Sequence, residues 1–193
     1  LDQIKDVIEK LPKVQSMRTK FLTCIFLFSI NVAYSQGQQL ESFPLSAVRI
    51  QDGPFLEAQQ TDMEYILALD PDRLLAPFLI DAGITPRAER YGNWENTGLG
   101  GHIGGHYLSA LAMMHASTGN DELKQRLDYM VDKLAECQQK NGNGYVGGIP
   151  DGKQVWQEIA SGKIDAHSFS LNNRWVPLYN IHKLFAGLRD AHT

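Results

Sequence analysis

The chain has 193 residues, of which 43% are hydrophobic and 21% are charged, and its formal net charge at pH 7 is −4. A mildly acidic chain without a run of basic residues argues against nucleic acid and anionic membrane surfaces as partners. The length is sufficient for a hydrophobic core. The composition therefore indicates a globular protein whose function has to be sought in its motifs.

Residues 17–35 have the pattern of a secretory signal peptide. A short basic stretch follows Met17, residues 21–33 are mostly apolar, and small residues precede the cleavage point. The apolar run is shorter than the roughly 20 residues that span a bilayer. We therefore expect cleavage after Ser35, a secreted or periplasmic protein, and no membrane association after cleavage. Residues 1–16 lie upstream of this start and are assigned no function.

The chain after the cleavage point is expected to begin with a polar, flexible leader over residues 36–44. Residues 47–50 alternate briefly between apolar and polar side chains and favour a short strand. Helical spacing of apolar residues then follows twice. Asp52 is expected to cap the first helix and Asp70 a shorter second one, since each precedes a proline near the first helical turn.

A loop of about 19 residues, 83–101, separates these helices from the next one, and loops of that length are usually functional or disordered. The helix after it is expected from about Gly101 to Ser117. One stripe of this helix is apolar, and His102 and His106 lie on an adjoining stripe. The apolar stripe consists of Ile103, Tyr107, Ala110, Leu111 and Met114.

The clearest helical pattern runs from Asp121 to Lys140. Its apolar face includes Cys137, which we interpret as a buried small hydrophobic residue and not as a nucleophile. After cleavage at Ser35 no second cysteine remains for an intrachain disulfide. A glycine-rich loop, a short helix with Trp156, a polar loop over 161–174 and a last helix complete the chain.

Helices alternate with glycine-rich loops along the whole sequence, and no series of strands competes with them. This pattern predicts an all-α architecture of packed antiparallel helix hairpins. Aromatic and histidine side chains gather near the junctions between loops and helices, so we expect them at one rim of the fold. The last helical pattern reaches Thr193 without a capping residue, and we expect the architecture to be incomplete in this chain.

The stretch 91–107 has the composition of a small-molecule site. Among several glycines it holds Trp94, Glu95, His102 and His106. Glycines permit close approach of the backbone to a ligand. A carboxylate beside an indole suits a sugar, whose hydroxyls bind Glu95 while its C–H face stacks on Trp94. The alternative for Glu95 is a solvated glutamate in a loop.

The two histidines also have the spacing of a zinc-binding helix, in which His residues lie four positions apart. The glutamate that serves as general base in such helices is missing between His102 and His106, and no third ligand is evident. Hydrogen bonding to a ligand and a purely structural role are therefore the two alternatives for the pair. His182 lies at the edge of the apolar stripe of the last helix, where a histidine is more often structural. No pair of carboxylates suited to glycoside hydrolysis stands out.

Five ordered motifs resemble bacterial β-L-arabinofuranosidases of glycoside hydrolase families 127 and 146, and their details are closer to family 146. Together they extend over residues 45–192. They include Gly144-Tyr145-Val146-Gly147-Gly148 and Tyr179-Asn180-Ile181-His182-Lys183, and lie at residues 48–55, 69–78, 91–112, 144–152 and 175–184.

The resemblance implies that residues 45–193 are the N-terminal part of an (α/α)6 toroid that acts on arabinose-containing plant oligosaccharides or polysaccharides. It also implies a retaining mechanism with a zinc-bound cysteine as nucleophile and a glutamate as acid/base. In the family these groups and the zinc lie downstream of the region seen here, and Cys137 does not match them. We therefore expect no catalytic residue, metal ligand or cofactor within the chain, and an inactive N-terminal fragment of a secreted glycosidase.

Six side chains match the motifs of the resembled family and are predicted to bind the substrate: Trp94, Glu95, His102, His106, Tyr145 and His182. Two other functions remain open. One is a different (α/α)6 carbohydrate enzyme, of the unsaturated glucuronyl hydrolase or lyase type. The other is a non-catalytic sugar-binding module.

Overall fold

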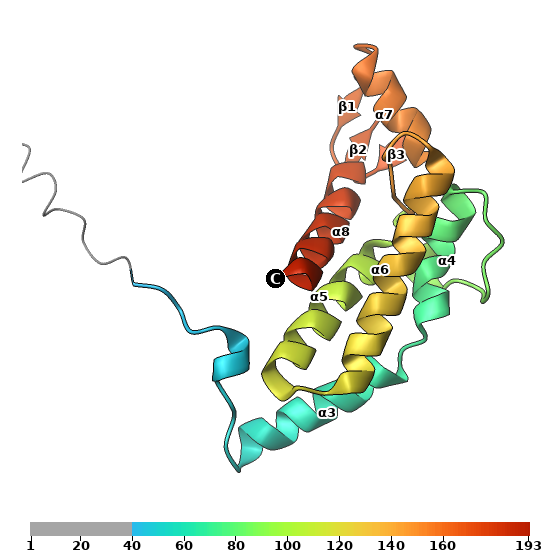
Figure 1. Cartoon of the computed structure of the whole chain (residues 1–193). Helices are drawn as coiled ribbons and strands as arrows, with labels where there is room; N and C mark the ends of the chain where they lie inside the picture. Colours follow the sequence, from blue (N-terminus) through green and yellow to red (C-terminus); the bar gives the residue numbers. More distant parts are fainter. Residues whose placement is uncertain (1–39) are drawn as a thin grey trace, which may run out of the picture. The chain divides into compact units, whose positions relative to one another are not determined.

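A computed structural model of the chain describes residues 40–193 (Figure 1). The predicted signal peptide, the residues upstream of it and the leader as far as residue 39 lie outside the described residues. Residues 43–193 form one folded unit. None of the helices in the described range has the length and hydropathy that crossing a membrane requires.

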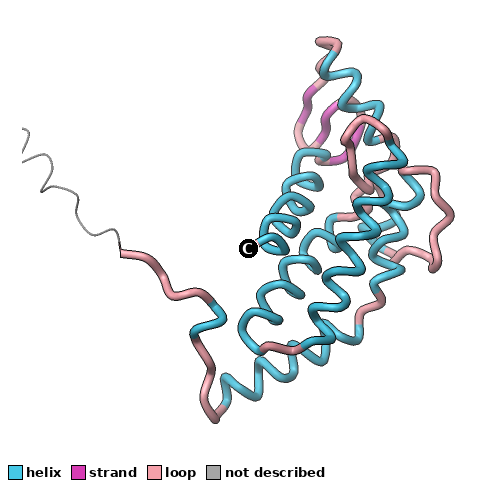
Figure 2. The backbone as a smooth tube through the Cα atoms, viewed as in Figure 1, coloured by secondary structure: helices cyan, strands magenta, loops and turns pink. Residues whose placement is uncertain are grey.

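Helices dominate the described residues, as Figure 2 shows, and this confirms the predicted all-α class. This helical architecture is consistent with a partial toroid. Two 3-10 turns, η1 (Leu45–Ala47) and η2 (Asn93–Asn96), accompany them. The helices are α3 (Pro54–Ala68), α4 (Pro71–Asp81), α5 (His102–Thr118), α6 (Asp121–Asn141), α7 (Gly152–Ala160) and α8 (Pro177–His192).

The first two helices begin at prolines, but only one is capped by the expected aspartate. The side chain of Asp70 accepts a hydrogen bond from the N–H of Asp72 and so caps α4 as predicted. At α3 the prediction of an Asp52 cap is wrong, since Gly53 occupies the cap position with a φ of 126°. The predicted strand over 47–50 is also wrong: residues 45–47 form the turn η1, and within residues 40–193 the exposed residues 48–50 pair with no strand.

Helix α6 follows the sequence prediction closely. Asn120 caps it by accepting hydrogen bonds from the N–H groups of Glu122 and Leu123, and Gly142 ends it in the left-handed conformation. The predicted apolar face is buried, and Cys137 is 0% exposed within it. This face packs on α4 and α5, and the three helices hold most of the core (Figure 1).

Helix α5 is rotated relative to the predicted apolar stripe, so part of that prediction is wrong. Ile103 is exposed, whereas His102, Gly105 and Leu108 are buried. The cause is the close crossing of α8, which lies beside α5 (Figure 1). A Cβ on Gly105 would lie 2.4 Å from the carbonyl carbon of Lys183. The glycines of this motif thus serve helix packing, where the sequence indicated room for a ligand.

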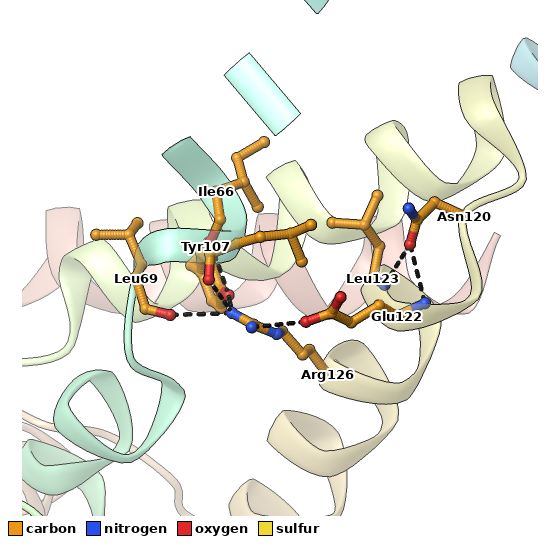
Figure 3. A network of polar contacts seen from close by, with 8 residues as sticks. Ile66, Leu69, Tyr107, Asn120, Glu122, Leu123 and Arg126 are labelled. Atoms are coloured by element: carbon orange, nitrogen blue, oxygen red, sulfur yellow. Dashed lines mark hydrogen bonds and ion pairs between the residues drawn. The ribbon is translucent and has the colours of Figure 1, made fainter. Parts of the chain in front are cut away.

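Arg126 of α6 joins three helices through a network of hydrogen bonds (Figure 3). Its Nη1 donates to the carbonyl oxygens of Leu67 and Leu69 at 2.6 and 3.1 Å, and Nη2 pairs with Glu122 at 2.8 Å. The hydroxyl of Tyr107 on α5 lies 3.5 Å from the same guanidinium. Carbonyl groups at the end of a helix lack intrahelical partners. Arg126 supplies such a partner where α3 ends and α4 begins.

The predicted polar loop between α7 and α8 contains a small antiparallel sheet. Its strands are β1 (Ala166–His167), β2 (Ser170–Leu171) and β3 (Arg174–Trp175), in the order β1-β2-β3. Strands of two residues are too short for an alternating pattern, so periodicity could not predict them. The sheet leads directly into the start of α8 and fixes the position of Trp175.

Candidate functional site

A hollow of about 840 Å³ lies beside the N-terminus of α5. It is bounded by the ends of α3 and α4, by the long loop before α5 and by β3. Three of the six predicted site residues, Trp94, Glu95 and His102, line it. The other lining residues are Tyr65, Leu69, Leu74, Tyr91, Gly92, Asn93, Thr97, Ile103 and Trp175.

Glu95 holds the start of α5 from inside the protein. Its side chain is buried, Oε2 accepts from the N–H of Gly101 at 2.7 Å, and Oε1 accepts from the N–H of Ile103 at 3.0 Å. The first N–H groups of a helix have no partner within the helix, and the helix dipole favours a negative charge there. Glu95 is therefore not a solvated loop residue: both its oxygens accept hydrogen bonds from the start of α5.

The ring of His102 is fixed by two acceptors. Its Nδ1 lies 2.7 Å from Oε1 of Glu95 and 2.8 Å from the carbonyl oxygen of Leu99, so Nδ1 carries a hydrogen. Burial lowers the pKa of His102, but the hydrogen bonds to Glu95 and Leu99 and the charge of Glu95 outweigh it and raise the pKa above its ordinary value. Nε2 is the ring nitrogen left for other contacts.

Aromatic rings surround His102. The ring of Trp94 lies 6.3 Å from it and that of Tyr179 lies 6.2 Å away, measured between ring centres. Trp94 and Trp175 meet edge to face at 6.4 Å with an angle of 86° between their planes. The exposed fraction of Trp94 is 62%. Exposed indoles in such a corner present apolar ring faces to solvent, as ligand-binding surfaces do.

Trp175 and Tyr179 were missed by the sequence interpretation, although both lie in the same motif as His182. Their positions depend on two features that no local pattern reveals. Val176, between strand β3 and α8, has a φ of 40°, a strained conformation for a β-branched residue that is retained where the surrounding structure requires it. Buried Asn180 donates from Nδ2 to the carbonyl oxygens of Leu99 and Gly100 at 3.2 and 2.8 Å, and so ties α8 to the loop before α5.

His106 and His182 do not line the hollow but lie on exposed positions of α5 and α8. Burial lowers the pKa of His106, and the positive charges of Lys183, His102 and His182 lower it further. The ammonium group of Lys183 lies 4.8 Å from the ring centre of Tyr179. These side chains form a second part of the site, the cationic face. It consists of His106, His182 and Lys183 and adjoins the hollow at His102, one helical turn before His106.

Tyr145 is not brought to this site. Its hydroxyl packs against the backbone of Gly147 and Gly152, since a Cβ on either glycine would lie 2.1 or 2.0 Å from that oxygen. Burial raises the pKa of Tyr145, and the nearby charge of Asp81 raises it further. The tyrosine that the sequence indicated as a stacking surface therefore fills space beside α7.

The described residues do not fit the zinc site that the family resemblance implies. Within residues 40–193, no group of three or more His, Cys, Asp or Glu side chains is placed to hold a metal ion. His102 uses Nδ1 on Glu95 and Leu99. Burial raises the pKa of the Cys137 thiol to about 11, which leaves it protonated and unreactive. We therefore assign no metal-dependent chemistry to residues 40–193.

Residues 47–193 match a family model described as "Beta-L-arabinofuranosidase, GH127 catalytic domain". The matched residues include both parts of the site, the hollow and the cationic face. A search of curated proteins found no match to the chain.

Proposed function

The chain belongs to the family of GH127 β-L-arabinofuranosidase catalytic domains and is therefore a glycoside hydrolase of that family; on this premise, we propose that residues 91–107 and 175–183 bind L-arabinofuranosyl units of plant glycans. In this proposal the cationic face and Trp94 hold the sugar that is released. The observation that carries the proposal is the exposed pair His106 and His182 next to His102, whose ring lies 6.3 Å from the exposed ring of Trp94. Hydrogen bonds of Asn180 and Glu95 hold the elements that carry these residues together.

The chemistry of these side chains suits a neutral sugar. The lowered pKa of His106 keeps its imidazole neutral at neutral pH, so one ring nitrogen can donate to a hydroxyl and the other can accept. The ammonium group of Lys183 adds donors and no acceptor. Trp94 offers an apolar face to the C–H groups of the sugar ring, and its position beside His102 fixes that face relative to the histidines.

We assign binding and orientation to this part of the chain, and not bond cleavage. Glycoside hydrolysis normally uses two carboxyl groups about 5–10 Å apart. Glu95 is the carboxylate that lines the hollow, and both its oxygens are engaged by α5 and His102. We therefore propose that a retaining mechanism uses groups outside this site. The 193-residue chain alone should then bind an aryl L-arabinofuranoside without hydrolysing it.

Of the alternatives, a different (α/α)6 carbohydrate enzyme is disfavoured by the family match over residues 47–193. A non-catalytic sugar-binding module would bind the same sugar at the same site, and it would differ from the proposed enzyme only in not cleaving the glycosidic bond. We also propose that the protein is exported and that its mature form begins at Gln36, on the pattern of residues 17–35. N-terminal sequencing of exported protein tests this, and a retained Leu1 would contradict it.

Calorimetric titration of the chain with methyl β-L-arabinofuranoside tests the binding function. We expect His106→Ala to weaken binding about tenfold, which corresponds to about 1.4 kcal/mol. His167→Ala is the matched control, because the side chain of His167 is 72% exposed on strand β1 and paired only with Asp165. Equal affinities of the wild type and the His106 variant would contradict the assignment.

A further inference from the structure

The hollow has more aromatic surface than the released sugar needs. Besides Trp94, three further rings line it, those of Tyr65, Tyr91 and Trp175. Tyr65 belongs to α3 and is 64% exposed. The hollow of about 840 Å³ falls within the range of about 300–1,000 Å³ that is typical of ligand sites. It lies next to the cationic face and does not include it.

One ring of the aromatic lining, that of Tyr91, is held in place by Arg73 and Asp70. The guanidinium of Arg73 lies 3.9 Å from the ring centre of Tyr91, and the hydroxyl of Tyr91 accepts a hydrogen bond from the N–H of Asp70 at 3.0 Å. Arg73 also donates from Nε to the carbonyl oxygen of Glu89 at 3.0 Å. These contacts fix the long loop against the start of α4. A ligand that stacks on rigid rings orders few side chains, which favours binding.

Apart from the buried Glu95–His102 pair, the side chains that line the hollow carry no charge. The carboxylate of Glu95 is engaged on both oxygens, and the Nδ1 of His102 is bonded to it. The remaining polar groups are the uncharged side chains of Tyr65, Asn93 and Thr97, together with the indole N–H groups. Aromatic faces with uncharged hydrogen-bonding groups suit a neutral sugar ring, which has one apolar C–H face and hydroxyls at its edge.

We propose that the hollow binds a second, neutral sugar unit of the same glycan, adjacent to the arabinofuranosyl unit at the cationic face. The ring of Trp94 separates the two units, and Tyr65, Tyr91 and Trp175 contact the second one. This inference rests on the proposed function and extends it: the substrate is an oligosaccharide or polysaccharide recognised over at least two units, and an acidic second unit is rejected because its carboxylate would be desolvated without a partner.

The test compares a one-unit and a two-unit ligand on the 193-residue chain by calorimetry: methyl β-L-arabinofuranoside and the neutral disaccharide that carries the same terminal unit. We expect the disaccharide to bind about tenfold more tightly than the one-unit ligand. Tyr65→Ala should remove most of that difference. Phe55→Ala is the matched control, because Phe55 is an aromatic residue of the same helix, 78% exposed and outside the hollow. Trp175→Ala provides a second variant from another element and should act in the same direction.

The outcomes separate the two proposals. Equal affinity of the wild type for the two ligands would overturn the second-unit inference and leave the proposed function intact. Equal loss of affinity for both ligands in the Tyr65 variant would also overturn it. Absence of binding by the one-unit ligand would contradict the proposed function itself. Binding of a disaccharide with a uronic acid as second unit, as tightly as the neutral one, would contradict the inferred preference for a neutral unit.

Discussion

Replacement of Glu95 by glutamine should destabilise the fold far more than a loop substitution normally does. Three donors converge on this carboxylate: the N–H groups of Gly101 and Ile103 and the Nδ1 of His102, at 2.7, 3.0 and 2.7 Å. Glutamine offers one acceptor oxygen, and its NH2 group faces a donor at the other position. The loss of one charge-assisted bond costs about 1.5–3 kcal/mol. Removal of the whole group in Glu95→Ala should cost about 3–5 kcal/mol.

The assay is urea unfolding followed by circular dichroism, with Glu89→Gln as the control. Glu89 is an exposed glutamate of the same loop, and surface substitutions usually change the unfolding free energy by less than about 0.5 kcal/mol. We expect an intact helical spectrum and a lower urea midpoint for the Glu95 variant alone. Equal midpoints of the two variants would refute the role of Glu95 as a buried cap.

The same pair makes stability depend on pH. The pKa of His102 is raised in the folded protein, because its hydrogen bonds to Glu95 and Leu99 and the charge of Glu95 outweigh the opposing effect of burial. The stability that protonated His102 adds to the fold is fully present below the ordinary histidine pKa of about 6.5, and it is lost as the pH rises through the folded-state pKa of His102. The difference in unfolding free energy between the wild type and Glu95→Gln should therefore become smaller as the pH rises through that range. NMR titration of His102 should show a raised pKa in the wild type and a lower one in the variant.

Three further substitutions or reagents test the packing. Gly187→Ala should lower the unfolding free energy by about 1–3 kcal/mol in thermal denaturation, because the new Cβ would lie 2.3 Å from the carbonyl oxygen of Gly105. An unchanged melting midpoint would contradict the close crossing of α5 and α8. Burial raises the pKa of Asp81 to about 6, and its Oδ2 has no hydrogen-bond partner among the described residues. Asp81→Asn should therefore stabilise the protein by about 1–3 kcal/mol at pH 7 and by almost nothing below pH 4. An effect that does not change with pH would refute this. In a Cys24→Ser background, Cys137 should react with a thiol reagent only after unfolding, and rapid reaction of the native protein would show that it is accessible.

The parts of the fold that sequence predicts are those with strong local signals. Helix α6 has a long amphipathic face, an asparagine cap and a terminal glycine, and its bounds were almost correct. The buried face of α5 could not be predicted, because the crossing of α8 at Gly105 and Gly187 decides it and glycines carry no hydrophobic signal.

The candidate site shows the same division. Residue composition drew attention to the stretch 91–107, part of which lines the hollow, but it could not tell which of its polar side chains turn inward. Glu95 turns inward because the cap residue of α5, Gly101, lies six residues after it, and the N–H groups there need an acceptor. Tyr145 fills space against glycines, an arrangement that depends on tertiary contacts. Trp175 reaches the hollow through the small sheet and the strained Val176, which no periodicity reveals.

The most direct test of the sugar-binding assignment uses the three tryptophan indole signals as reporters. In a 1H–15N NMR titration of the chain with methyl β-L-arabinofuranoside, we expect the Trp94 signal to shift together with the backbone signals of His102 and His106. The Trp156 signal on α7, outside the hollow and the cationic face, should remain in place. Shifts at Trp156 with none at Trp94, or no shifts at all, would contradict the assignment of this site to L-arabinofuranosyl units.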